Sequence, residues 1–149
     1  MKYLFAPLLA VVLLSTPTYA QSPTRPPESP VTPLKAPQWP AKYEHRVSAV
    51  KDLIASHSAL YGLTEAQQDF IFQIINCENK ELEPGLQSRI IQADGTREPS
   101  FGLVQIHLPS HPVTQAQASD PEFAIKFIVK NVAAGREDMW SCARILKHN

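Results

Sequence analysis

Residues 74–106, IINCENKELEPGLQSRIIQADGTREPSFGLVQI, hold one carboxylate in an unfavourable position. Glu78 follows the apolar run FIFQII at residues 70–75, which has the pattern of the second half of a helix. At 3.6 residues per turn, Glu78 falls on the same stripe as Ile71 and Ile75, and this stripe faces a core. Loss of hydration there, and the negative end of the helix dipole, both raise the pKa of a carboxyl group.

A carboxyl group that keeps its proton near neutral pH is suited to one reaction in particular. Cleavage of a glycosidic bond requires protonation of the leaving oxygen as the bond breaks. The alternative is that the helix ends at Cys77 and that Glu78 turns into solvent, because helix ends are uncertain by a residue or two. Periodicity alone leaves both interpretations open.

The N-terminal part of the chain has the composition of a secretory leader followed by a linker. Residues 1–20 combine a basic Lys2, a short apolar run and small residues before a cleavage point, which predicts a signal peptide and export to the periplasm or beyond. The apolar run is too short to span a bilayer, so no membrane anchor is expected in the mature protein. Residues 21–40 hold seven of the fourteen prolines and predict an extended linker. Residues 41–149 remain for one compact domain.

The charge and the cysteines further restrict the class of protein. Removal of the signal peptide takes away Lys2, so 13 of the 14 basic residues remain with 14 acidic ones and the formal charge is −1. Basic and acidic residues are scattered along the chain. This pattern does not favour nucleic acid or anionic lipid as a partner, and a monomer is expected. Cys77 and Cys142 in an exported chain predict a disulfide, which would close a loop of about 66 residues and add about 4 kcal/mol of stability.

Periodicity and end signals predict a mainly helical α+β domain with one small β-hairpin. Thr64 and Gln67 form a capping box for the helix that ends with Glu78. Asp94 and Gly95 give the hairpin signal. Residues 100–106 after Pro99 are expected to form a short helix or turn. The remaining elements are helices at 41–61, 121–135 and 137–146, and a hairpin at 88–98 that would be the only sheet.

The order of helix, Cys-Glu pair, hairpin and SFGLVQI resembles the lytic transglycosylase (SLT) family of lysozyme-like domains. Members of that family carry a Glu-Ser pair at a helix end and a later SxGLMQI segment. Here the pair is Glu78 and Asn79, and the segment spans residues 100–106. The similarity covers residues 59–131, and it implies a lysozyme-like domain that acts on peptidoglycan glycan strands without a cofactor.

The resemblance also implies roles for single residues. Glu78 would be the only general acid/base: it would protonate the glycosidic oxygen after N-acetylmuramic acid and then take the proton of the sugar's own hydroxymethyl group, which gives a 1,6-anhydro product. Ser100 and Gln105 would line the sugar cleft, and Gly102 would let the backbone approach closely. The small size and the linker would suit an enzyme that opens the wall for a secretion or conjugation apparatus.

The sequence departs from the family pattern in three places. Asn79 replaces the serine, and the hairpin lengthens the separation between Glu78 and Gly102. The family's later AYNAG segment, whose tyrosine contacts the acid, has no counterpart, because the chain ends in MWSCARILKHN. Trp140, held near the helix of Glu78 by a bridge from Cys142, would replace part of that wall. A lysozyme-type hydrolase and a non-catalytic wall-binding or adaptor module are the alternatives.

Other side chains with chemical potential have simpler interpretations. Asp94 could be the second carboxylate of a hydrolase, but Asp before Gly is more often a turn residue. His107 and His111 are separated by Pro109 and lack a third ligand, so no metal site is expected. Three further acids are interpreted as solvated loop charges: Glu81, Glu83 and Glu98.

Overall fold

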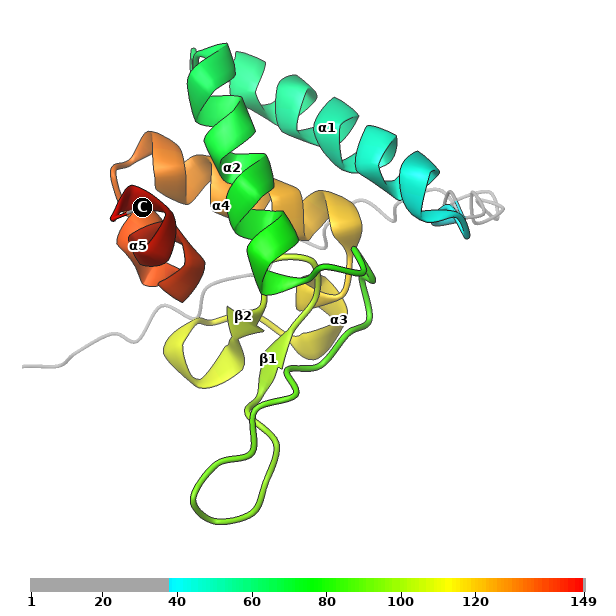
Figure 1. Cartoon of the computed structure of the whole chain (residues 1–149), viewed down its shortest axis with the longest axis vertical. Coiled ribbons are helices and arrows are strands. Elements are labelled where there is room, and N and C mark those ends of the chain that lie inside the picture. The colour runs from blue at the N-terminus through cyan, green and yellow to red at the C-terminus, as the bar shows by residue number, and fades with distance from the viewer. Residues whose placement is uncertain (1–37, 149) are drawn as a thin grey trace, which may run out of the picture. The chain divides into compact units, whose positions relative to one another are not determined.

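The computed structural model describes residues 38–148. The predicted signal peptide, and the predicted linker up to residue 37, lie outside these residues. Within them the chain is mainly helical with a small two-stranded antiparallel sheet, which confirms the mainly α form of the α+β class (Figure 1). The elements are α1 (Tyr43–Ala59), α2 (Glu65–Glu78), β1 (Ser100–Phe101), β2 (Ile106–His107), the 3-10 turn η1 (Leu108–Ser110), α3 (Gln115–Ala118), α4 (Pro121–Ala133), the 3-10 turn η2 (Glu137–Met139) and α5 (Ser141–Lys147).

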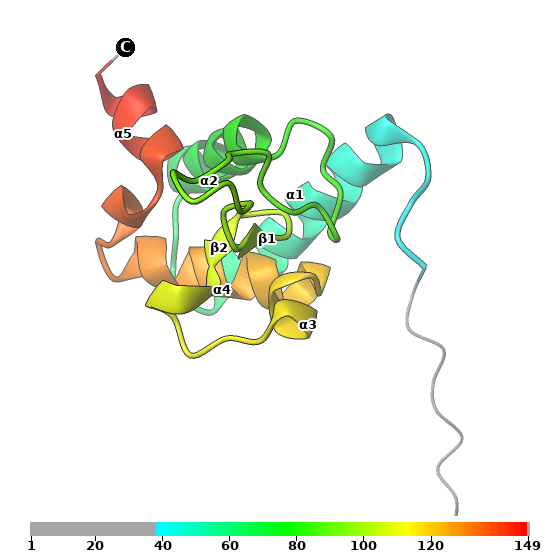
Figure 2. The same cartoon turned by 90° about the horizontal axis from the view of Figure 1, so that it is seen from below.

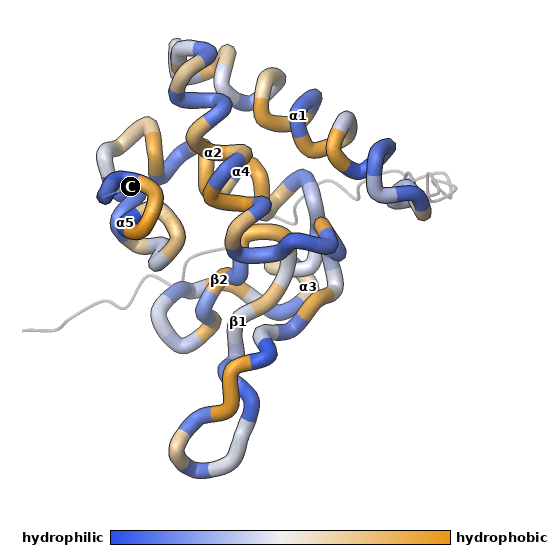
Figure 3. The backbone as a smooth tube through the Cα atoms, viewed as in Figure 1, coloured by the Kyte–Doolittle hydropathy of each residue, from blue (hydrophilic) through white to orange (hydrophobic). Residues whose placement is uncertain are grey.

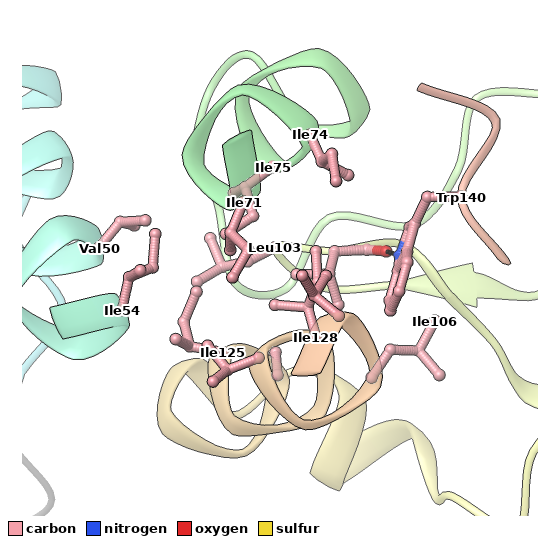
Figure 4. Packing of buried hydrophobic residues seen from close by; sticks show 14 of the residues in the cluster. Val50, Ile54, Ile71, Ile74, Ile75, Leu103, Ile106, Ile125, Ile128 and Trp140 are labelled. Carbon is pink, nitrogen blue, oxygen red and sulfur yellow. Dashed lines mark hydrogen bonds between the residues drawn. The ribbon is translucent and has the colours of Figure 1, made fainter. Parts of the chain in front are cut away.

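The core lies between α1, α2 and α4, and Leu103 from the segment that connects β1 to β2 lies in its middle (Figure 4). Its side chains are mostly branched aliphatic, and each stabilises the fold by about 1.5–3 kcal/mol when it is fully buried. The labelled members are Val50, Ile54, Ile71, Ile74, Ile75, Leu103, Ile106, Ile125, Ile128 and Trp140. No helix within residues 38–148 is long and apolar enough to cross a membrane.

Helix α2 begins and ends where its sequence signals predict. The Thr64 hydroxyl accepts a hydrogen bond from the Gln67 N–H at 3.3 Å, and the Gln67 side chain accepts one from the Thr64 N–H at 2.9 Å, so the capping box is confirmed. Ile71 and Ile75 are fully buried, and the helix includes Glu78 as its last residue. The apolar stripe therefore fixes which way the last turn of α2 faces.

The prediction that residues 88–98 form the only sheet is wrong. The tight turn is present, since the Gln92 N–H donates to the Thr96 carbonyl at 2.8 Å, but the arms share only one isolated bridge, between Ile91 and Arg97. Ile90 and Ile91 are 62% and 60% exposed, in the loop that protrudes from the domain (Figure 3). Because both side chains are exposed, they form no packed face that could stabilise a longer ladder.

The two-stranded sheet is formed instead by the ends of the SFGLVQI segment and by His107, although a short helix or turn was predicted for residues 100–106. Ser100 pairs with His107 and Phe101 with Ile106. The connecting turn begins at Gly102, whose φ is +84°. A Cβ atom there would lie 1.8 Å from the carbonyl oxygen of Ala118 in α3, so glycine is required by packing as well as by backbone conformation.

Two helical segments near the C-terminus differ from expectation. Helix α3 was not predicted, although Thr114 and Gln117 form the same kind of capping box as the one that precedes α2. The predicted single helix at 137–146 is wrong: η2 and α5 are separated by Trp140, whose backbone is extended. The Trp140 indole donates to the Val104 carbonyl at 2.8 Å, and this buried bond holds the break between the two segments in place.

Helix α4 agrees with its predicted start, whereas the folded domain begins earlier than predicted. Helix α4 is capped by Asp120, which accepts from the Phe123 N–H at 2.7 Å, as the sequence predicts. Trp39 falls within the predicted linker, but it packs against the core and its indole N–H donates to the Leu82 carbonyl at 3.0 Å.

Candidate functional site

A cleft of about 530 Å³ lies beside the end of α2. It is lined by the last residues of α2, the loop that follows, the hairpin loop at 88–98, the sheet, and residues 139–144. Helices α2 and α5 are in contact, and Figure 2 shows α5 beside α2. A cleft of this size lies within the range of about 300–1,000 Å³ that is typical of small-molecule sites.

Glu78 is a half-buried acid in the lining of this cleft. Its Oε1 accepts a hydrogen bond from the Cys142 N–H at 3.1 Å and from the Ser141 hydroxyl at 3.3 Å. The Cys77–Cys142 disulfide is present, with the two Cα atoms 5.9 Å apart, and it joins the end of α2 to the first turn of α5. The residues that contact the acid therefore come from the C-terminal segment of the chain.

The pKa of Glu78 is raised above its ordinary value, chiefly because burial removes water from the carboxylate. The hydrogen bonds from Cys142 and Ser141 oppose this effect, because they stabilise the charged form. Among the nearby charges, Glu98 raises the pKa and Arg144 lowers it. The direction agrees with the prediction from the apolar stripe, and the alternative of a fully solvated Glu78 does not hold.

Asn79 has a structural role directly after the acid. It is 1% exposed, and its amide nitrogen donates to the carbonyl oxygens of Glu83 at 2.8 Å and Gly102 at 3.2 Å. Its side-chain oxygen accepts from the Glu83 N–H at 3.3 Å. A serine hydroxyl has only one hydrogen to donate, so it could not make both bonds to carbonyl oxygens. Asn79 thus ties the end of α2 to the turn that connects β1 to β2.

The predicted wall residues are only partly in the cleft. Ser100 and Gln105 line it, whereas Gly102 is buried against α3. The Gln105 amide donates to the carbonyl oxygens of Leu86 at 3.2 Å and Gly102 at 2.9 Å, so it holds the wall together. Trp140 is 5% exposed and is both a core residue and part of the cleft wall.

Asp94 lies away from the cleft lining, at the tip of the hairpin loop. Its Oδ1 accepts from the Thr96 N–H at 2.9 Å and from the Thr96 hydroxyl at 2.6 Å. These bonds lower the pKa of Asp94 below its ordinary value. Asp94 is therefore a turn residue, and it does not lie in the cleft with Glu78.

Sequence reasoning missed two contributors to the site. Ser141 contacts the acid, and no local pattern identifies it. Glu98 was predicted to be a solvated loop charge, but it is half-buried and lines the cleft. Glu98 lies two residues before the SFGLVQI segment, and this position next to a predicted wall of the cleft could have identified it. Of the other acids, Glu81 pairs with Arg89 at 2.6 Å and Glu83 pairs with Arg46.

The two histidines have local partners. The Nδ1 of His107 lies 2.8 Å from the Ser110 hydroxyl, and His111 packs edge-on against Phe127 with ring centroids 5.2 Å apart. Burial lowers the pKa of His111. Within residues 38–148, no group of three or more His, Cys, Asp or Glu side chains could hold a metal ion.

The chain was compared with protein-family models, with curated proteins and with solved structures, and none of these comparisons found a match. The chemistry of the site therefore rests on its own geometry. A carboxyl group with a raised pKa, held by two donors in an open cleft, can give a proton to a ligand and remain stabilised afterwards as a carboxylate.

Proposed function

We propose that this chain is a peptidoglycan-cleaving enzyme of the lytic transglycosylase type, with Glu78 as its general acid/base. The observation that carries the proposal is the position of Glu78: half-buried at the edge of a cleft, with a raised pKa and two fixed hydrogen-bond donors. The resemblance of the Cys-Glu and SFGLVQI segments to the family supports the choice of substrate. Export directed by residues 1–20 would bring the enzyme to the wall.

The reaction proceeds in two steps that need one carboxyl group. Glu78 gives its proton to the glycosidic oxygen, and the C1–O bond breaks with its electron pair left on that oxygen. The sugar's N-acetyl group stabilises the cationic carbon. Glu78 then takes the proton of the 6-hydroxyl group as that oxygen bonds to C1. The product is a 1,6-anhydro sugar, no water is consumed, and Glu78 is protonated again.

The surroundings of Glu78 suit both of its protonation states. Burial favours the protonated form that the first step uses. The Cys142 N–H and the Ser141 hydroxyl donate to the carboxylate that the first step creates. In this proposal the two donors do the work of the tyrosine contact in the family, because they hold the carboxylate of Glu78 in place.

Hydrolysis of the same bond is a second candidate, and the presence of Glu98 in the cleft favours it. Most glycosidases use two carboxyl groups, one as proton donor and one to activate water or to form a glycosyl intermediate. Glu78 would be the donor in both cases. The products separate the two reactions, because a reducing-end sugar is one water heavier than the anhydro sugar.

The test is the release of soluble muropeptides from purified peptidoglycan, analysed by mass spectrometry. Glu78→Gln should lower the rate of release about 10²-fold or more, which is the usual contribution of a positioned acid. Glu65→Gln is the matched control, because Glu65 is exposed in the first turn of the same helix and should keep the wild-type rate. Release by a folded Glu78→Gln variant at the wild-type rate would refute the proposal.

A further inference from the structure

Glu98 lies in the same cleft as Glu78 but comes from a different part of the chain. It ends the hairpin loop, and Pro99 separates it from β1. Its backbone is fixed on both sides: its N–H donates to the Ile90 carbonyl at 2.9 Å, and its carbonyl accepts from the Gln87 amide at 3.3 Å. The cleft therefore contains a second half-buried carboxyl group on a different wall from Glu78, whereas the third carboxyl group of the lining, that of Glu81, is exposed and paired with Arg89.

The side chain of Glu98 is oriented by Ser88. The Ser88 hydroxyl lies 2.7 Å from Oε2 of Glu98. The same hydroxyl oxygen accepts from the Ile90 N–H at 3.3 Å, so its hydrogen is free to point at the carboxylate. Ser88 is 7% exposed, and its own N–H donates to the Ser100 carbonyl at 2.8 Å. A solvated loop charge has no need of such support, whereas a carboxylate that must face a ligand does.

We infer that Glu98 is the anionic partner of Glu78, which faces the substrate and stabilises the positive charge that develops on the sugar as the glycosidic bond breaks. This inference rests on the proposed function of the cleft. Glu98 forms no covalent bond in this role, so the proton and electron balance of the reaction is unchanged. The contribution is electrostatic: a fixed negative charge in a partly dehydrated cleft acts more strongly than it would in water.

The division of roles follows from the surroundings of the two acids. Two carboxylates in one site disfavour double ionisation, so one of them holds a proton more readily. The charge of Glu98 raises the pKa of Glu78, and this adds to the larger effect of burial. Arg144 of α5 acts in the opposite direction. The other charged or titratable groups that line the cleft are Lys80, Glu81, Arg89 and His107.

Three variants test the inference on intact protein and purified peptidoglycan. In Glu98→Gln, kcat should fall about 10²-fold, a loss comparable to removing one preorganised electrostatic contact in other enzymes. Because Glu78 would then lose its proton more easily, the alkaline limb of the kcat/KM profile should move to lower pH. Ser88→Ala should lower kcat less, by about tenfold, because it keeps the charge of Glu98 and removes only one hydrogen bond that orients it. Asp94→Asn, on the same loop but outside the cleft, should match wild type.

A second measurement does not depend on activity. The Glu78 carboxyl carbon, labelled with ¹³C and titrated by NMR, should show a lower pKa in Glu98→Gln than in wild type. If the folded Glu98→Gln variant has the wild-type rate and an unchanged alkaline limb in its kcat/KM profile, the inference about Glu98 is refuted, while the proposed function still stands. An unchanged pKa of Glu78 in this variant would refute the inference in the same way. Absence of soluble product from the wild-type protein, by contrast, would refute the proposed function.

Discussion

The disulfide between Cys77 and Cys142 should contribute both to stability and to the geometry of the acid. The perturbation is the double replacement Cys77→Ser and Cys142→Ser, which removes the bridge with a small change in side-chain volume. Helix α5 has only seven residues, and a helix of that length is unstable without tertiary contacts. Without the bridge, the Trp140 indole bond to the Val104 carbonyl remains as a buried anchor close to the start of α5.

The expected loss can be worked out from the loop that the bridge closes. The two cysteines are 65 positions apart, and the chain-entropy relation for a loop of that length gives about 4 kcal/mol at 25 °C. Small domains have unfolding free energies of about 5–15 kcal/mol, so the loss is a large fraction of the total. For a domain of this size it should lower Tm by roughly 15 °C.

The assay is urea unfolding followed by circular dichroism, with wild type and the double variant measured at the same pH. Reduction of wild type with dithiothreitol should give a similar loss, and the same reductant should leave the double variant unchanged. Muropeptide release should also fall, because the Cys142 N–H and the Ser141 hydroxyl are no longer held against Glu78. A double variant within about 1 kcal/mol of wild type would show that the loop-closure argument does not apply here.

Two further predictions concern stability. Gly102→Ala should destabilise the fold by clearly more than the ~1–2 kcal/mol that a left-handed conformation costs an alanine, because its Cβ would lie 1.8 Å from the Ala118 carbonyl oxygen. Gly62→Ala, with φ of +64° and no neighbour within 4 Å, should lose only that smaller amount in thermal unfolding, and equal losses would contradict the packing argument. The raised pKa of Glu78 means that its contribution to stability is fully present below its unfolded-state pKa, about 4.3, and is lost as pH rises through the folded-state value. In urea unfolding at pH 4 and pH 8, Glu78→Gln should therefore gain stability relative to wild type at the higher pH, and the opposite trend would exclude a raised pKa.

Local sequence signals correctly predicted those elements whose formation depends only on a few neighbouring residues. The capping box at Thr64 and the apolar stripe through Ile71 and Ile75 correctly predict α2, because a cap and a helical period act over one or two turns. The prediction of a sheet at residues 88–98 failed because a sheet depends on contacts beyond its own turn. Its turn signal is local, but a ladder needs a covered face, and Ile90 and Ile91 are left exposed.

The sequence by itself predicted the amphipathic helix that carries Glu78 and the pairing of Cys77 with Cys142, but it left open whether Glu78 turns into solvent. The packing around the end of α2 decided that Glu78 is half-buried with a raised pKa. Only the tertiary structure decided which groups meet that acid. The Ser141 and Cys142 donors lie 63 and 64 positions away along the chain, and Glu98 reaches the cleft through a loop held by Ser88. No short-range pattern encodes such contacts, because the packing of α5 and of the loop against α2 brings them together.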